Sequence, residues 1–62
     1  MKKNYKFEYA INQEVLIKAI EVSGFVTRIV IEGKNIFYWV CYWWLGEQRF
    51  SKVDAFEIEA HG

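Results

Sequence analysis

The sequence contains no proline, and among its 62 residues Cys41 is the only cysteine and His61 the only histidine. An intrachain disulfide needs a second cysteine, and structural zinc sites need several cysteine or histidine ligands. Disulfides and metals are the usual supports of domains this small. We therefore expect no metal and no other cofactor, and we expect the fold to depend on its apolar core.

An excess of charge of one sign is also missing, because eight basic side chains balance eight acidic ones. Domains dedicated to nucleic acids usually carry a basic excess, so this balance disfavours that class. The longest apolar run, residues 36–45, is about ten residues long and too short to cross a bilayer. No apolar stretch of a signal peptide follows Lys2 and Lys3. Together with the single thiol, these absences predict a cytoplasmic protein without a membrane segment.

Catalytic side chains are scarce as well. The one imidazole, on His61, lies next to the C-terminus, where chains often fray. Cys41 lies within an aromatic run, which suits packing better than reactivity. Glu57 and Glu59 resemble paired carboxylates, but charged residues at this spacing are also common on solvated strand edges. Nucleophilic or acid–base catalysis needs several such groups within reach of each other, so we expect no enzymatic activity.

What the sequence has in abundance is aromatic side chains: three Trp, four Tyr and five Phe, which make up 19% of the chain. Each can bury about 150–250 Å². The length of the chain fits a single domain over residues 1–62. Aromatic residues are therefore expected to supply most of the core of one small domain.

Hydrophobic periodicity predicts a mostly-β chain. Residues 4–11 alternate between apolar and polar side chains, which predicts an extra N-terminal strand before a domain of residues 14–60. Asn12-Gln13 is a predicted turn, because asparagine tolerates the left-handed conformation. Further strands are predicted at 25–32, 36–44, 48–53 and 56–60, with turns at 32–35, 45–47 and 54–55.

Residues 13–22 fit two secondary structures. Asn12 could cap a helix, Glu14 and Lys18 have helical spacing, and Gly24 could end the helix. The β-branched residues of the segment favour a strand instead. A helix here would give an alternative α+β fold, in which it packs on a three- or four-stranded sheet.

Five blocks of residues occur in an order that resembles SH3-like small β-barrels, with the layout of Tudor and KOW-type domains. The order resembles short uncharacterised proteins encoded by phages and prophages more closely still. The blocks are Ile11-x-x-x-Val15-x-Ile17-Lys18, Gly24-Phe25-Val26-Thr27-x-Ile29, Tyr38-x-Val40-x-Tyr42-Trp43, Gly46-Glu47-x-Arg49 and Glu57-Ile58-Glu59.

The resemblance covers roughly residues 9–60 and implies a five- or six-stranded antiparallel SH3-like barrel with a strand at 14–20. Asn12 departs from the pattern, since such barrels often have glycine there, and so does the extra segment 4–8. SH3-like barrels bind ligands or dock proteins, although the fold does not choose the partner. The resemblance thus implies a non-catalytic binding module, and the phage likeness a small accessory or inhibitor protein.

The strand at 36–44 carries more aromatic side chains than a small core requires. Alternation separates its residues onto two faces. The resemblance implies that Tyr38, Val40 and Tyr42 point inward, so Phe37, Trp39, Cys41 and Trp43 point outward. An exposed aromatic patch marks an interaction site, and tryptophan is enriched in binding hot spots. We therefore predict that Phe37, Trp39 and Trp43 bind a partner.

Four occupants of this face remain open. The N-terminal strand carrying Tyr5, Phe7, Tyr9 and Ile11 could fold over it. A protein partner, or a second copy of the chain, could bind it. Single-stranded nucleic acid could stack on it, with basic contacts from Arg28, Lys34, Arg49 and Lys52. A methyl-lysine could enter an aromatic cage. Protein binding or self-association is the predicted function, and nucleic-acid binding is the alternative.

Overall fold

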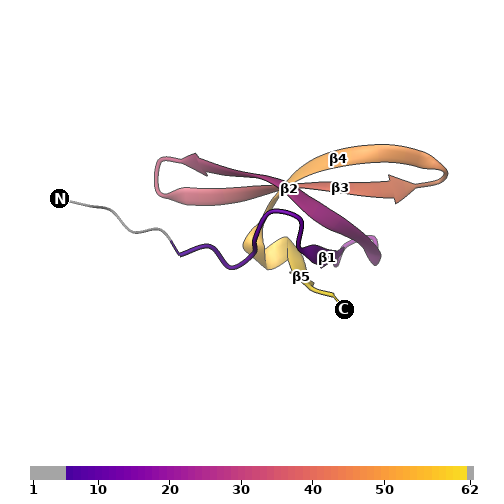
Figure 1. Ribbon diagram of the computed structural model, residues 1–62, viewed down its shortest axis with the longest axis horizontal. Helices are drawn as coiled ribbons and strands as arrows, with labels where there is room; N and C mark the ends of the chain where they lie inside the picture. Colours follow the sequence, from indigo (N-terminus) through magenta and orange to yellow (C-terminus); the bar gives the residue numbers. More distant parts are fainter. Residues whose placement is uncertain (1–5, 62) are drawn as a thin grey trace.

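A computed structural model of the protein describes residues 6–61, which contain five strands and one short 3₁₀ turn (Figure 1). All strand pairs are antiparallel, in the order β4-β3-β2-β1-β5. Within residues 6–61 no hydrogen-bonded ladder joins β4 to β5, so the sheet is not closed into a barrel. The predicted mostly-β fold is confirmed, with five strands. Their bounds, with the turn η1, are β1 Glu14–Ile17, β2 Val22–Glu32, β3 Asn35–Trp44, β4 Glu47–Asp54, η1 Ala55–Glu57 and β5 Ile58–Ala60.

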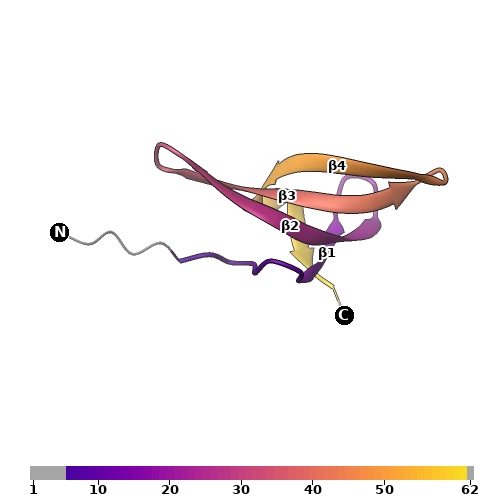
Figure 2. The same ribbon diagram turned by 45° about the horizontal axis from the view of Figure 1, so that its top comes forward.

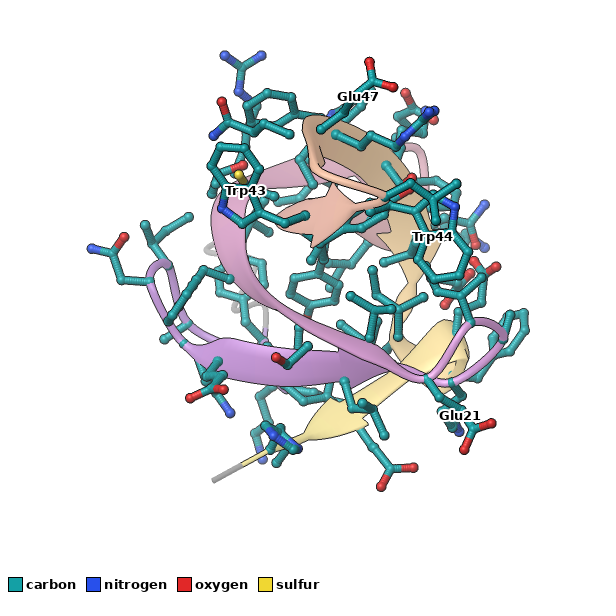
Figure 3. All side chains as sticks on the ribbon, turned by 90° about the vertical axis from the view of Figure 1, so that its right-hand side faces the viewer. Glu21, Trp43, Trp44 and Glu47 are labelled. Carbon is teal, nitrogen blue, oxygen red and sulfur yellow. The ribbon has the colours of Figure 1, made fainter. Side chains whose placement is uncertain are left out.

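The sheet is strongly twisted and curls over its own inner face. The long strands β2, β3 and β4 form one layer, and β1 and β5 lie beneath it (Figure 2). The view along the long axis shows side chains filling the space inside this curl (Figure 3). Every strand contributes to the buried core, which consists of Val15, Ile17, Val26, Tyr38, Val40, Val53 and Ile58.

Two tight loops fix the register of the three long strands. Gly33 opens the β2–β3 loop with a φ of 62°, the left-handed conformation that a turn with glycine at its first central position requires. In the β3–β4 loop both Leu45 and Gly46 have positive φ, 53° and 78°. Both turns were predicted from the sequence, and the left-handed φ of 72° at Asn12 agrees with the turn predicted there.

A β-bulge in β2 adjusts which of its side chains face inward. The register with β3 shifts between Val26 and Arg28. The intervening Thr27 donates its hydroxyl to the C=O of Trp39 at 3.2 Å. Because of the extra residue, Val26 and Ile29 both lie on the core side, although they are three residues apart.

The alternative helix at 13–22 is wrong. Residues 14–17 form β1, a loop follows at 18–21, and β2 begins at Val22. Val15 and Ile17 are both buried on the same side of β1, which is the period of a strand. The loop ends with Glu21 in the left-handed conformation, at a φ of 55°, and this reverses the chain toward β2.

The predicted N-terminal strand is also wrong for residues 6–11, which form no strand; Asn4 and Tyr5 lie outside the described residues. Alternation predicts which side chains share a face, but a strand also needs a neighbouring strand for its backbone groups. In this segment the N–H of Glu8 bonds instead to the Tyr38 hydroxyl, at 3.0 Å. Only Tyr9 packs on the core, with its ring edge-on to Tyr38 and the two centroids 5.4 Å apart.

We expect the Tyr9 phenol to make the stability of the protein sensitive to alkaline pH. Burial, with the charge of Glu8 as a second cause, raises the pKa of Tyr9 above its usual value of 10.0. The phenol also donates to the C=O of Ile58 at 3.2 Å, which only the protonated form can do. The stability that this group contributes is present below pH 10 and is lost as the pH rises through its raised pKa.

Urea unfolding between about pH 8 and pH 11 should therefore show a steeper loss of stability for the wild type than for Tyr9→Phe. The phenylalanine variant keeps the ring on Tyr38 but has no proton to lose. Parallel pH curves for the two proteins would contradict this expectation.

Candidate functional site

Strand β3 has two chemically distinct faces, as its alternation predicts. It pairs with β4 without any shift of register, so side chains alternate along its whole length. Tyr38 and Val40 are buried on the inner face, and Tyr42 packs beside them. Figure 3 shows that Trp43 and Trp44, which are adjacent in sequence, point to opposite sides of the β3–β4 hairpin.

The outer side of β3 continues onto both neighbouring strands. Phe25 on β2 and Phe50 on β4 lie directly opposite Cys41 in the two ladders. Trp43, Phe50 and Phe25 are 64%, 56% and 53% exposed, whereas the other members are half-buried. We call this surface the outer aromatic face; it consists of Phe25, Phe37, Trp39, Cys41, Trp43 and Phe50.

Phe25 and Phe50 were not among the residues predicted from the sequence, although part of the signal was present. The loop Leu45–Gly46 sets the β3–β4 register, and counting back from it places Phe50 opposite Cys41. Counting back from the loop Gly33–Lys34 in the same way does not place Phe25 opposite Cys41, because the bulge in β2 shifts the β2–β3 register by one residue. Phe50 was therefore predictable and Phe25 was not.

The predicted residue Phe37 is half-buried, whereas Trp43 is exposed, and a cation lies over the Phe37 ring. The ammonium group of Lys52 lies 4.8 Å from the centroid of the Phe37 ring, in a cation–π arrangement. Glu32 holds this ammonium through an ion pair of 2.8 Å. The accessible part of the face is consequently the part toward the β3–β4 hairpin.

A hollow opens beside Trp39 in this accessible part. Its volume is about 400 Å³ and it is lined by Thr27, Arg28, Trp39 and Phe50. The bulge creates its wall, since it brings Arg28 opposite Trp39 in the ladder. The hollow therefore combines two aromatic side chains with a guanidinium group. This combination suits an apolar side chain of a ligand that lies next to a hydrogen-bond acceptor of the same ligand.

The four predicted basic contacts do not form one patch. Arg28 and Lys52 flank Trp39 on the outer face, on β2 and β4 respectively. Arg49 lies opposite Tyr42 and hence on the other side of β4, 3.6 Å from Glu47. Lys34 lies in the β2–β3 loop, at the opposite end of β3 from Trp43. A nucleic-acid strand following the aromatic residues would meet two of the four cations.

The alternative in which the N-terminal segment covers the outer aromatic face is wrong for the described part of that segment. Tyr9 contacts Tyr38 and Ile58, which belong to the inner core. Phe7 and Ile11 remain 45% and 47% exposed. The physical reason is the turn at 10–13, in which Asn12 bonds to the Val26 C=O at 2.7 Å and brings the segment to the inner side.

The other chemically notable groups lie apart from each other. Cys41 is half-buried on β3 and accepts a hydrogen bond from the Gln48 side chain at 3.0 Å. His61 follows β5, at the far edge of the sheet, with its Nε2 3.8 Å from Glu14. Within residues 6–61 no three His, Cys, Asp or Glu side chains gather as they would around a metal ion. The same part of the chain contains no helix long and apolar enough to cross a membrane.

Comparison of the chain with models of protein families, with curated proteins and with solved structures gave no match.

Proposed function

We propose that this protein is a non-catalytic binding module whose outer aromatic face binds a protein partner. The observation that carries the proposal is the run of exposed aromatic side chains across three neighbouring strands, Phe25, Trp43 and Phe50, beside the half-buried Trp39. These residues contribute nothing to the buried core, which lies on the other side of the sheet. Burying these exposed tryptophan and phenylalanine rings against a partner would remove apolar surface from water, which favours binding.

We also propose that this curled but open sheet is related to the small barrels of the SH3-like kind. In support, β1 lies between β2 and β5, so the last strand of the chain returns to the first. A 3₁₀ turn, capped by Asp54, connects β4 to β5. The role of a phage or prophage accessory or inhibitor protein, and a location in the cytoplasm, stay predictions from the sequence.

Affinity capture from the cells that express the protein tests the proposed site. Trp39→Ala and Trp43→Ala should each leave the fold intact and reduce the captured partner at least tenfold, the effect of losing a hot-spot tryptophan. Phe56→Ala is the matched control: this aromatic residue is 73% exposed but lies on η1, whose Ala55 packs against the inner core. Equal loss of the partner with Phe56→Ala would contradict the proposal.

Salt dependence distinguishes the alternative function, binding of single-stranded nucleic acid. Contacts with phosphates release counterions, so such binding weakens steeply as salt is added. An aromatic protein interface is expected to lose little affinity over the same range. Arg28 and Lys52 are the two cations beside Trp39. Binding of an oligonucleotide that disappears with added salt and with Arg28→Ala would favour the alternative.

A further inference from the structure

Strand β4 is an open edge of the sheet. Within residues 6–61 it pairs only with β3. Trp44 and Glu47 flank the two-residue loop at 45–46, so they form a pair in which each residue gives one backbone hydrogen bond to the other. Pairs of this kind recur at every second residue along the β3–β4 ladder. The backbone N–H and C=O groups of the alternate residues therefore point away from the sheet. These residues are Gln48, Phe50 and Lys52.

No group in the described part of the chain bonds to these backbone donors and acceptors. At the end of β4 the edge is capped, because the N–H of Asp54 bonds to the Glu57 carboxylate at 2.7 Å. The opposite edge of the sheet, β5, has three residues, and its Ile58 C=O already accepts a hydrogen bond from Tyr9. The edge of β4 is thus the longer free template for another strand.

We propose that β4 pairs with β4 of a second copy of this chain, antiparallel, about a two-fold axis at Phe50. In this register Phe50 lies opposite Phe50 of the other copy. Every free N–H and C=O of the edge then finds a partner, because Gln48 lies opposite Lys52 in both directions. The intervening pairs are Arg49 with Ser51 and Glu47 with Val53. This interface uses the edge of the sheet and shares only Phe50 with the outer aromatic face. It does not depend on the function proposed for that face.

The side chains of β4 favour this particular register. No two charges of the same sign lie directly opposite each other, which is the arrangement that would oppose strand pairing. The 56%-exposed ring of Phe50 meets its own symmetry mate on the outer side of the joined sheets. The net charge of zero removes long-range repulsion between copies.

The two-fold arrangement also limits the assembly. Each copy uses its β4 edge, and an isologous contact of this kind closes at two copies. The remaining free edge, β5, is short and partly bonded by Tyr9. We therefore expect a dimer rather than a fibre.

Sedimentation equilibrium over a concentration series is the first test. The mass of the wild type should rise from 7.4 kDa toward twice that value as the chain concentration approaches about 1 mM. Phe50→Lys should hold the mass at that of the monomer at every concentration, because two ammonium groups would meet at the axis. Phe25→Lys is the matched control and should associate as the wild type does. Phe25 is 53% exposed and flanks Cys41 from the other side, on the interior strand β2.

A cross-linking experiment tests the register itself. Residues in a pair that exchanges both hydrogen bonds have Cα atoms about 5.5 Å apart, within the span of a disulfide. In a Cys41→Ala background, Phe50→Cys should form a covalent dimer under mild oxidation, and Phe25→Cys should not. A wild type that stays monomeric would overturn the proposal. Equal loss of association in Phe50→Lys and Phe25→Lys would also overturn it, because the copies would then be in contact through the outer aromatic face. Equal cross-linking of Phe50→Cys and Phe25→Cys would overturn it as well.

Discussion

Tyr38→Ala should unfold the protein at room temperature. Tyr38 is 1% exposed and is the largest fully buried side chain of the core. Truncating a buried aromatic side chain to alanine costs about 3–5 kcal/mol, because it removes apolar burial and leaves a cavity. A domain of this size has a total stability of only about that magnitude. Circular dichroism should show loss of the β spectrum, and thermal melts should show no cooperative transition.

The expected loss has a second part, because Tyr38 also holds the N-terminal segment in place. Its ring packs edge-on against Tyr9, and its hydroxyl accepts the hydrogen bond from the N–H of Glu8. Tyr38→Phe separates the two parts, since it keeps the ring and loses only the hydroxyl. We expect it to remain folded and to lose about 1 kcal/mol, the net value of one hydrogen bond.

Trp43→Ala is the control for Tyr38→Ala on the other face of the same strand. Trp43 is 64% exposed, so its truncation removes more atoms but leaves no buried cavity. We expect its melting temperature to fall by only a few degrees. Tyr38→Ala with a cooperative melt as high as that of Trp43→Ala would contradict the assignment of the core.

The two faces of β3 were predictable because they follow from a local rule. Alternation alone separates Tyr38 and Val40 from Trp39 and Trp43, and both ladders obey it. The loops at Gly33 and Gly46 were predictable for the same reason, since glycine supplies the positive φ that tight hairpins need. These features depend on neighbours a few residues apart.

Features that depend on distant neighbours could not be read in this way. The alternation of residues 4–11 is as regular as that of a strand, but no sheet edge receives residues 6–11. The bulge at Thr27 has no mark in the sequence, and it decides that Phe25 lies beside Cys41. The outer aromatic face was therefore predicted along β3 and missed across β2. Which strand edge remains unpaired is likewise a property of the assembled sheet.

Gly24 is the residue whose role the sequence conceals most completely. It fits the end of a helix over 13–22 as well as a boundary before a strand, and glycine is common in both. In the structure it lies within β2, opposite Tyr42 on one side and Val15 on the other. It is absent from the glycines with positive φ, which are Gly33 and Gly46. Its role is therefore close approach between strands rather than a special backbone conformation.

Gly24→Ala should consequently be the most damaging glycine substitution in the described chain. A Cβ at this position would overlap the backbone C=O oxygen of Cys41. It would also lie 2.9 Å from both Tyr42 Cβ and Val40 Cγ1. The carbonyl cannot move aside without breaking the β2–β3 ladder, in which Phe25 pairs with Cys41. We expect a loss of about 3 kcal/mol or more, the upper range for overpacking, and hence an unfolded or barely folded protein.

Gly46→Ala is the matched control, because it tests backbone conformation without a clash. Gly46 has a φ of 78°, and a Cβ there would meet nothing within 4 Å. An alanine in the left-handed conformation costs roughly 1–2 kcal/mol, so this variant should stay folded with a lower melting temperature. An argument from backbone conformation alone would predict that Gly46→Ala is the more damaging of the two substitutions, since of these two glycines only Gly46 has a positive φ. Thermal melts of both variants decide between the two arguments: if Gly24→Ala melts at or above Gly46→Ala, the close packing of β2 on β3 at this point is not what the protein requires.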